Sequence, residues 1–193
     1  SRFFTKVFRS YSALIMMAAS GIILVCKLMT KLLVSDEFYD SWQYIPLLVL
    51  ATAFSCLVNF LGSVYMVKKK SLLSLVTTAA GAGLNIALNF LLIPVMGVNG
   101  AALATFASYL FVFLLRAVTA RWFLFIDYGA AKLAVNTLLL VSQSVCMLLQ
   151  PPYWFLLQAG FVLFIFAVNS KELLENAQKL LPRNRTAQGR SSK

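Results

Sequence analysis

The sequence predicts an all-α, polytopic membrane protein, and its composition is the first observation that predicts this. Of its 193 residues, 61% are hydrophobic and 12% are charged. Soluble globular domains average about 45–50% apolar and about 25% charged residues. A soluble chain of this length could not bury so much apolar surface in one core. The bilayer must therefore act as its solvent.

Six long apolar runs are the second observation. A helix needs about 20 apolar residues to cross a hydrocarbon core of about 30 Å. Membrane-spanning strands would alternate polar and apolar residues, and these runs do not alternate. We therefore predict a six-helix transmembrane lobe over residues 11–168, with spans at about 11–33, 44–67, 72–95, 100–123, 131–149 and 153–168.

The distribution of Lys and Arg is the third observation. With a cytoplasmic N-terminus, every basic residue except Lys27 and Lys31, which lie in the first span, falls on the cytoplasmic side. The outer loops carry no basic residue, as the positive-inside rule requires. The net charge of +11 thus indicates membrane orientation and not nucleic-acid binding. Both termini are predicted to be cytoplasmic.

The segments that flank the spans are richer in charged residues than the spans are. Residues 1–10 are basic and resemble a cytoplasmic loop between spans, which suggests a portion of a larger transporter. Residues 169–182 combine apolar residues at helical spacing with charged ones, a pattern typical of an amphipathic helix on the inner membrane surface. Residues 183–193 are predicted to form a disordered basic tail.

Several kinds of chemistry are excluded by what the chain lacks. Histidine is absent, so no Ser–His or Cys–His nucleophile pair can form, and a zinc site is not expected. Each of the three cysteines lies in an apolar run without metal or redox spacing. All six acidic residues fall in predicted loops or in the tail, which argues against an intramembrane aspartyl protease. We predict no enzymatic activity and no cofactor or metal.

Charged residues inside a span are costly and indicate function by default. Lys27 lies well inside the first span, and Lys31 follows one turn later on the same face. Two interpretations remain open. The side chains can snorkel outward, toward Asp36, Glu37 or Asp40, or Lys27 can face an aqueous cavity. Arg116 lies near the inner surface and is predicted to snorkel.

A polar stripe on the third span supplies the other candidate residues. Thr77, Gly81, Asn85 and Asn89 recur four residues apart and so share one helix face. Small and polar residues at this spacing let membrane helices approach closely and hydrogen-bond to each other. The alternative is that Asn85 and Asn89 line a polar transport path.

The stretch from Leu84 to Thr105 resembles the C-terminal half of bacterial polysaccharide flippases. These O-antigen and capsule exporters belong to the MATE-like multidrug/oligosaccharidyl-lipid/polysaccharide superfamily. The matching pattern is Asn85-x-x-Leu88-Asn89, Leu92-Ile93-Pro94, Gly97 and Gly100-Ala101-Ala102-x-Ala104-Thr105. The acidic loop before Trp42 and the Lys68–Lys70 loop also resemble family loops. The resemblance covers about residues 1–170, and the family's first six-helix lobe is missing.

The resemblance implies a function. The substrate would be an oligosaccharide linked to undecaprenyl pyrophosphate, flipped across the bacterial inner membrane by alternating access for surface polysaccharide biosynthesis. Lys27, with a smaller part for Lys31, would bind the head group, and Asn85 and Asn89 would contact substrate. Expected partners are the missing N-terminal lobe, membrane lipids and a glycan polymerase.

Two rival functions remain open. A multidrug or organic-cation antiporter of the same superfamily is the nearest, although lysines in the pathway disfavour a cationic substrate. A non-transporting membrane scaffold of a glycan assembly complex would satisfy the generic helix packing equally well.

Overall fold

The computed structural model describes residues 2–180, with the side chains of residues 2–175, and this part of the chain contains helices and no strands. The helices are α1 (Arg2–Leu33), the short 3-10 helix η1 (Asp36–Gln43), α2 (Ile45–Val67), α3 (Ser71–Met96), α4 (Val98–Ala120), α5 (Ala130–Leu149) and α6 (Trp154–Leu180). All six α-helices are long and apolar enough to cross a membrane. The predicted all-α class with six membrane helices is confirmed.

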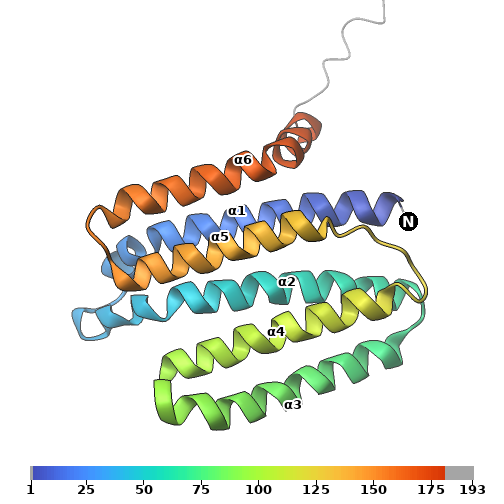
Figure 1. Cartoon of the computed structure of the whole chain (residues 1–193), viewed down its shortest axis with the longest axis horizontal. Helices are drawn as coiled ribbons and strands as arrows, with labels where there is room; N and C mark the ends of the chain where they lie inside the picture. Colours follow the sequence, from blue (N-terminus) through green and yellow to red (C-terminus); the bar gives the residue numbers. More distant parts are fainter. Residues whose placement is uncertain (1, 181–193) are drawn as a thin grey trace, which may run out of the picture.

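The helices form two groups of three, as Figure 1 shows. In the first group α1, α5 and α6 pack against one another; in the second, α4 packs against both α2 and α3. Contacts of α2 with α1 and α5 join the groups. Helix α3 lies at the edge of the molecule in Figure 1, and only 6% of its most apolar window is buried.

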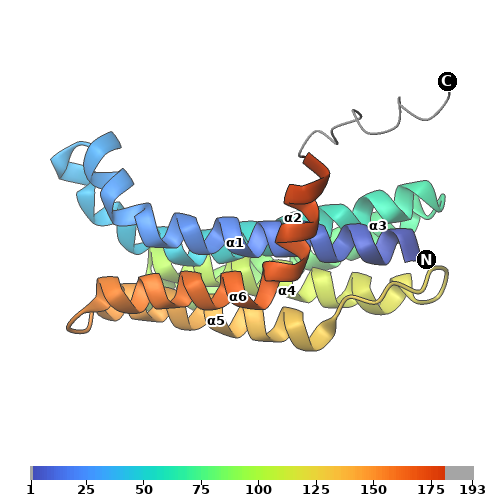
Figure 2. The ribbon, with the colours of Figure 1, turned by 90° about the horizontal axis from the view of Figure 1, so that it is seen from above.

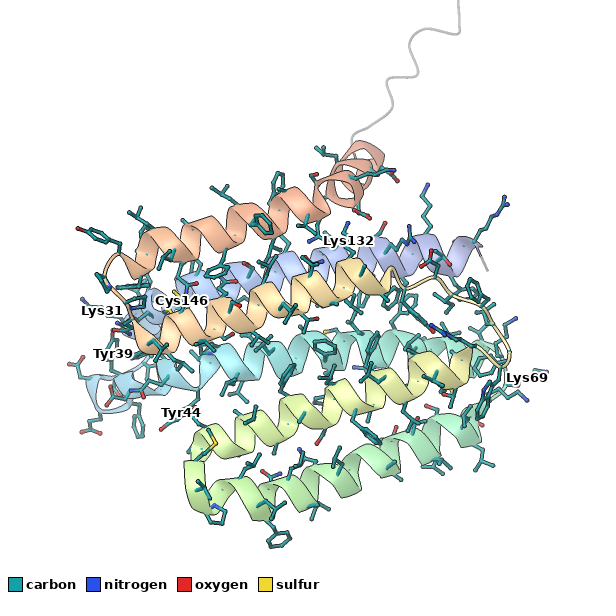
Figure 3. All side chains as sticks on the ribbon, in the orientation of Figure 1. Lys31, Tyr39, Tyr44, Lys69, Lys132 and Cys146 are labelled. Atoms are coloured by element: carbon teal, nitrogen blue, oxygen red, sulfur yellow. The ribbon has the colours of Figure 1, made fainter. Side chains whose placement is uncertain are left out.

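The chain runs back and forth between two ends of the bundle (Figures 1 and 2). One end holds the start of α1, the Lys68–Lys70 turn and the segment that joins α4 to α5; we call it the basic end. The opposite end holds η1, the α3–α4 turn and the α5–α6 turn. Figure 3 shows Lys69 at the basic end and Lys31 and Tyr39 at the other.

The helix α1 begins earlier than the sequence suggested. Residues 2–10 were expected to form a loop, but α1 is continuous from Arg2. Its first turns are held by Phe8, which is fully buried and packs against Phe60, Phe113 and Tyr128. The basic residues Arg2, Lys6 and Arg9 lie before the apolar run, yet the helix includes them, because Lys and Arg are good helix formers.

The C-terminal segments partly follow the prediction. Helix α6 is continuous through the predicted span 153–168 and into the predicted amphipathic segment, up to Leu180. Figure 2 shows that its last turns bend away from the direction of the first part. The end of the amphipathic segment and the predicted tail at 183–193 lie outside the described residues.

The turn between α3 and α4 depends on two glycines. Gly97 separates the helices with φ 57° and ψ −132°, a conformation that favours glycine. A Cβ at Gly100 would lie 2.3 Å from the carbonyl oxygen of Leu92. The two helices can therefore meet only because residue 100 has no side chain.

Candidate functional site

Arg116 of α4 is a buried charge within the second helix group. Its side chain is almost enclosed, with a residue exposure of 4%. Nε donates to Thr77 Oγ1 at 3.1 Å, and Nη1 donates to the carbonyl oxygen of Val58 at 2.7 Å. Nη2 donates to Thr78 Oγ1 at 2.9 Å and to Ser74 Oγ at 3.1 Å. The guanidinium thus joins α4 to both α2 and α3.

The surrounding sequence provides space and oxygen atoms for this guanidinium. Ser74, Thr77 and Thr78 lie in the first turns of α3, on the side that faces α4. On α2, a Cβ at Gly62 would lie 2.8 Å from Nη1, so glycine makes room. The Tyr65 ring lies 5.6 Å from the guanidinium carbon, within the range of a cation–π contact.

No carboxylate neutralises Arg116. Residues 41–126 contain neither Asp nor Glu, so α2, α3 and α4 have no acidic side chain at all. All the acceptors of the guanidinium are neutral oxygens. A buried charge normally has a partner of opposite sign, because removing an ion from water is expensive. The three helices therefore carry an uncompensated positive charge.

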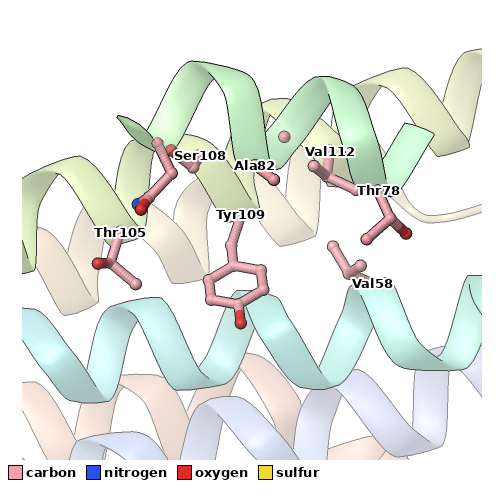
Figure 4. Close-up of a pocket in the computed structure, with 9 residues that line it drawn as sticks. Val58, Thr78, Ala82, Thr105, Ser108, Tyr109 and Val112 are labelled. Atoms are coloured by element: carbon pink, nitrogen blue, oxygen red, sulfur yellow. The ribbon is translucent and has the colours of Figure 1, made fainter. Parts of the chain in front are cut away.

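A partly polar cavity of about 260 Å³ adjoins this charge (Figure 4). It lies between α2, α3 and α4 and is lined by Val58, Thr78, Gly81, Ala82, Asn85, Thr105, Ser108, Tyr109 and Val112. Thr78 connects the two features, since its hydroxyl accepts from Arg116 and its side chain lines the cavity. Most of the lining residues come from the central turns of α3 and α4, and Val58 comes from α2.

The cavity presents both donors and acceptors. Thr105 and Ser108 donate their hydroxyl protons to the carbonyls of Ala101 and Ala104, which leaves oxygen lone pairs as acceptors. Asn85 Oδ1 accepts from Asn89, and within the described residues the Asn85 amide nitrogen donates to no protein group. Hydroxyl oxygens, one amide donor and an aromatic ring suit a neutral polar ligand such as a sugar.

The predicted stripe on α3 is divided between two roles. Thr77 bonds to Arg116, and Gly81 allows close packing, because a Cβ there would lie 2.1 Å from Val112 Cγ2. Both residues thus hold α3 against α4. Asn85 lines the cavity, while Asn89 lies one turn beyond and donates to Asn85 at 2.9 Å. Only Asn85 of the two predicted asparagines therefore lines this cavity.

The predicted lysines lie in the other helix group. The Lys27 ammonium is 4.7 Å from the centroid of Trp42 and 5.2 Å from that of Trp154, so two indole rings hold it. Lys31 is exposed and, within residues 2–180, forms no ion pair with the acids of η1. The structure does not bring the four predicted residues together: α1 carries the lysines and α3 the asparagines, with α2 between them (Figure 1).

Arg116 is the residue that sequence reasoning missed. It was expected to snorkel to the inner surface, and that expectation was wrong. Its guanidinium turns inward because Ser74, Thr77 and Thr78 offer hydroxyls on a neighbouring helix. The signal was present in the sequence as three hydroxyl residues at helical spacing. The pairing of α3 with α4 is what the sequence alone did not reveal.

The first helix group has buried polar contacts of another kind. Ser20, Gln143 and Gln158 connect α1, α5 and α6 through hydrogen bonds of 2.8–3.1 Å. Asn136 and Asn169 exchange two hydrogen bonds between α5 and α6. These groups contain no charge and hydrogen-bond across the helix contacts, so they stabilise helix packing, although Gln158 Oε1 has no partner within the described residues.

Comparison with protein-family models, with curated proteins and with solved structures finds no match to this chain. The six apolar helices fit a multi-pass membrane protein.

Proposed function

We propose that this protein flips undecaprenyl-pyrophosphate-linked oligosaccharides across the bacterial inner membrane for surface polysaccharide biosynthesis. The proposal rests on the resemblance of residues 84–105 to polysaccharide flippases. It is supported by one observation above all: the uncompensated, buried charge of Arg116 beside a partly polar cavity between three apolar helices. Both termini of the chain are cytoplasmic in this proposal, and a further six-helix lobe completes the transporter.

The sign of the buried charge selects the substrate class. A fixed cation in a medium of low dielectric constant attracts an anion strongly and repels a cation. Arg116 therefore favours an anion such as a pyrophosphate over a cation beside α2, α3 and α4. The Asn85 amide and the oxygens of Thr105 and Ser108 suit the hydroxyl groups of the attached sugar. Lys27 and Lys31 add positive charge near the opposite end of the bundle.

The two rival functions make different demands. A multidrug or organic-cation antiporter needs an anionic or neutral path, and α2, α3 and α4 provide a cationic one without a carboxylate. A non-transporting scaffold of a glycan assembly complex needs no partly polar cavity between its helices. Neither rival explains why a guanidinium without a carboxylate partner is kept within three apolar helices.

The test is a deletion strain of the source bacterium complemented with variants. The deletion should abolish surface glycan, cause lipid-linked intermediates to accumulate and leave drug susceptibility unchanged. Arg116→Met should restore much less surface glycan than wild type at equal protein level. Arg121→Met, the same substitution at an exposed arginine of the basic end, is the matched control and should restore it fully.

Other outcomes would overturn the proposal. Gain of drug susceptibility with intact surface glycan would identify the antiporter. Loss of glycan without accumulation of a lipid-linked intermediate in the inner leaflet would favour the scaffold. Full complementation by Arg116→Met would remove Arg116 from the transport path.

A further inference from the structure

Two further cavities lie at the basic end, and their lining comes mainly from α1, α5, α6 and the segment before α5. The larger, of about 470 Å³, is lined by Arg2, Thr5, Lys6, Arg9, Ser10, Phe125, Asp127, Lys171, Glu172 and Glu175. The smaller, of about 290 Å³, includes Arg9, Ser12, Lys132, Asn136 and Glu172. Arg9 and Glu172 line both, so the cavities adjoin. We call them together the basic-end pocket.

Three ion pairs build the walls of this pocket. Arg9 pairs with Asp127, Lys132 with Glu172, and Lys6 with Glu175 at 3.9 Å. They connect α1 to the segment before α5, α5 to α6, and α1 to α6. The three acids of the pocket are thereby occupied by three of its five basic residues.

Two cations remain for a ligand. Within residues 2–175, Arg2 and Lys171 line the pocket and take part in no ion pair. Arg9 Nε is also buried without a hydrogen-bond partner in the described structure. The pocket therefore has a net positive charge and an unused donor, which suit an anion with several oxygens.

The position of the pocket favours the anionic head group of a lipid over a soluble anion. Its basic residues Arg9, Lys132 and Lys171 lie at the ends of predicted membrane spans, where lipid head groups are expected. Phe125 lines it and is 67% exposed, and two aromatic residues elsewhere at the basic end, Phe3 and Trp122, are 72% and 75% exposed. A soluble anion needs no such apolar surroundings, whereas the acyl chains of a lipid do. Basic pockets between membrane helices on the cytoplasmic side are known to hold anionic head groups.

We propose that the basic-end pocket binds one anionic phospholipid by its phosphate. Arg2 and Lys171 contact the phosphate oxygens, the free Arg9 Nε–H donates to one of them, and the acyl chains lie along the exposed aromatic residues. The lipid would then add a further connection between α1 and α6, which already pack against each other. This inference does not depend on the transported substrate.

The experiment uses the full chain purified in detergent. Dioleoyl-phosphatidylglycerol and dioleoyl-phosphatidylcholine are titrated separately, with bound lipid counted by native mass spectrometry and the thermal midpoint recorded. Phosphatidylglycerol should bind and raise the midpoint, and phosphatidylcholine should do neither. The double variant Arg2→Gln/Lys171→Gln should bind phosphatidylglycerol about thirtyfold more weakly, since each of the two charges near an anionic head group contributes about 1 kcal/mol.

Two control variants make the result decisive. Lys68→Gln/Lys69→Gln removes two charges from the same end but outside the pocket, and it should bind like wild type. Arg2→Lys/Lys171→Arg keeps both charges and should also bind, which separates charge from folding. Equal weakening in both glutamine variants would show a diffuse surface effect and overturn the proposal. So would equal binding of phosphatidylcholine, or saturation of the same stabilisation by inorganic phosphate.

Discussion

At the scale of single residues, Arg116 shows that a buried charge can serve a purpose other than stability. Replacing a buried ion by an apolar residue of similar volume is often neutral or stabilising. Here the hydroxyls of Thr77 and Thr78 also donate to the Ser74 carbonyl, so removal of the guanidinium leaves neither without an acceptor. The cost of keeping Arg116 buried is therefore an argument for function.

This reasoning predicts an order of thermal stability among variants of Arg116. Arg116→Met should unfold at the wild-type temperature or above it. Arg116→Lys should unfold earlier, because an ammonium remains buried but cannot reach Val58, Thr77 and Thr78 together; the loss should be about 1.5–3 kcal/mol. Thermal unfolding in detergent, followed by intrinsic fluorescence, measures both. A methionine variant less stable than the lysine variant would contradict the argument.

Lys27 allows a second prediction at this scale. Two cation–π contacts hold its ammonium, so Lys27→Met should cost about 1–2 kcal/mol in the same unfolding assay. Lys31→Met, one turn along α1 and exposed, is the control and should change stability little. Loss of glycan export by Lys27→Met without loss of stability would instead favour the head-group role that the sequence suggested.

At the scale of elements, the α3–α4 turn is where sequence and structure agree most closely. The glycines that the resemblance singled out are the ones that the geometry requires. Gly97 takes a positive φ, and Gly100 lies against the Leu92 carbonyl. A local turn of this kind can be read from the sequence, because all its determinants lie within a few residues.

Substitution in this turn should be costly. Gly100→Ala forces its Cβ against backbone atoms of Leu92 and Ile93, so the turn must open, at a cost of about 1–3 kcal/mol. Gly83→Ala, on the same α3 with no atom within 4 Å of the added Cβ, is the matched control. The yield of monodisperse protein after detergent extraction, together with the unfolding temperature, should separate the two. Equal behaviour would mean that the close approach does not exist.

At the scale of the whole molecule, the number of membrane helices followed from hydropathy, whereas their pairing did not. The hydropathy of a segment depends on its own residues alone, whereas helix pairing depends on contacts between segments that are distant in the sequence. The contact between Arg116 and α3 joins residues 38–42 positions apart, and Lys27 meets Trp154 from the far end of the chain. Sequence reasoning therefore identified the helix face that carries Asn85, but it left the surroundings of Lys27 open and expected Arg116 at the surface.

The alternation of the six helices gives the last prediction, which concerns orientation. The Lys68–Lys70 turn and η1 lie at opposite ends of the bundle (Figure 3). If basic residues are retained in the cytoplasm, Lys69 faces inward and Asp40 outward. With the three native cysteines replaced by alanine, Asp40→Cys should react with a membrane-impermeant maleimide in cells whose outer layers are permeable to it. Lys69→Cys should react only after lysis. Both positions are exposed, so access to the reagent depends on the side of the membrane.

The reverse labelling would invert the topology and move the basic-end pocket to the outer leaflet. Labelling of both sites in intact cells would mean that the helices between them do not cross the bilayer.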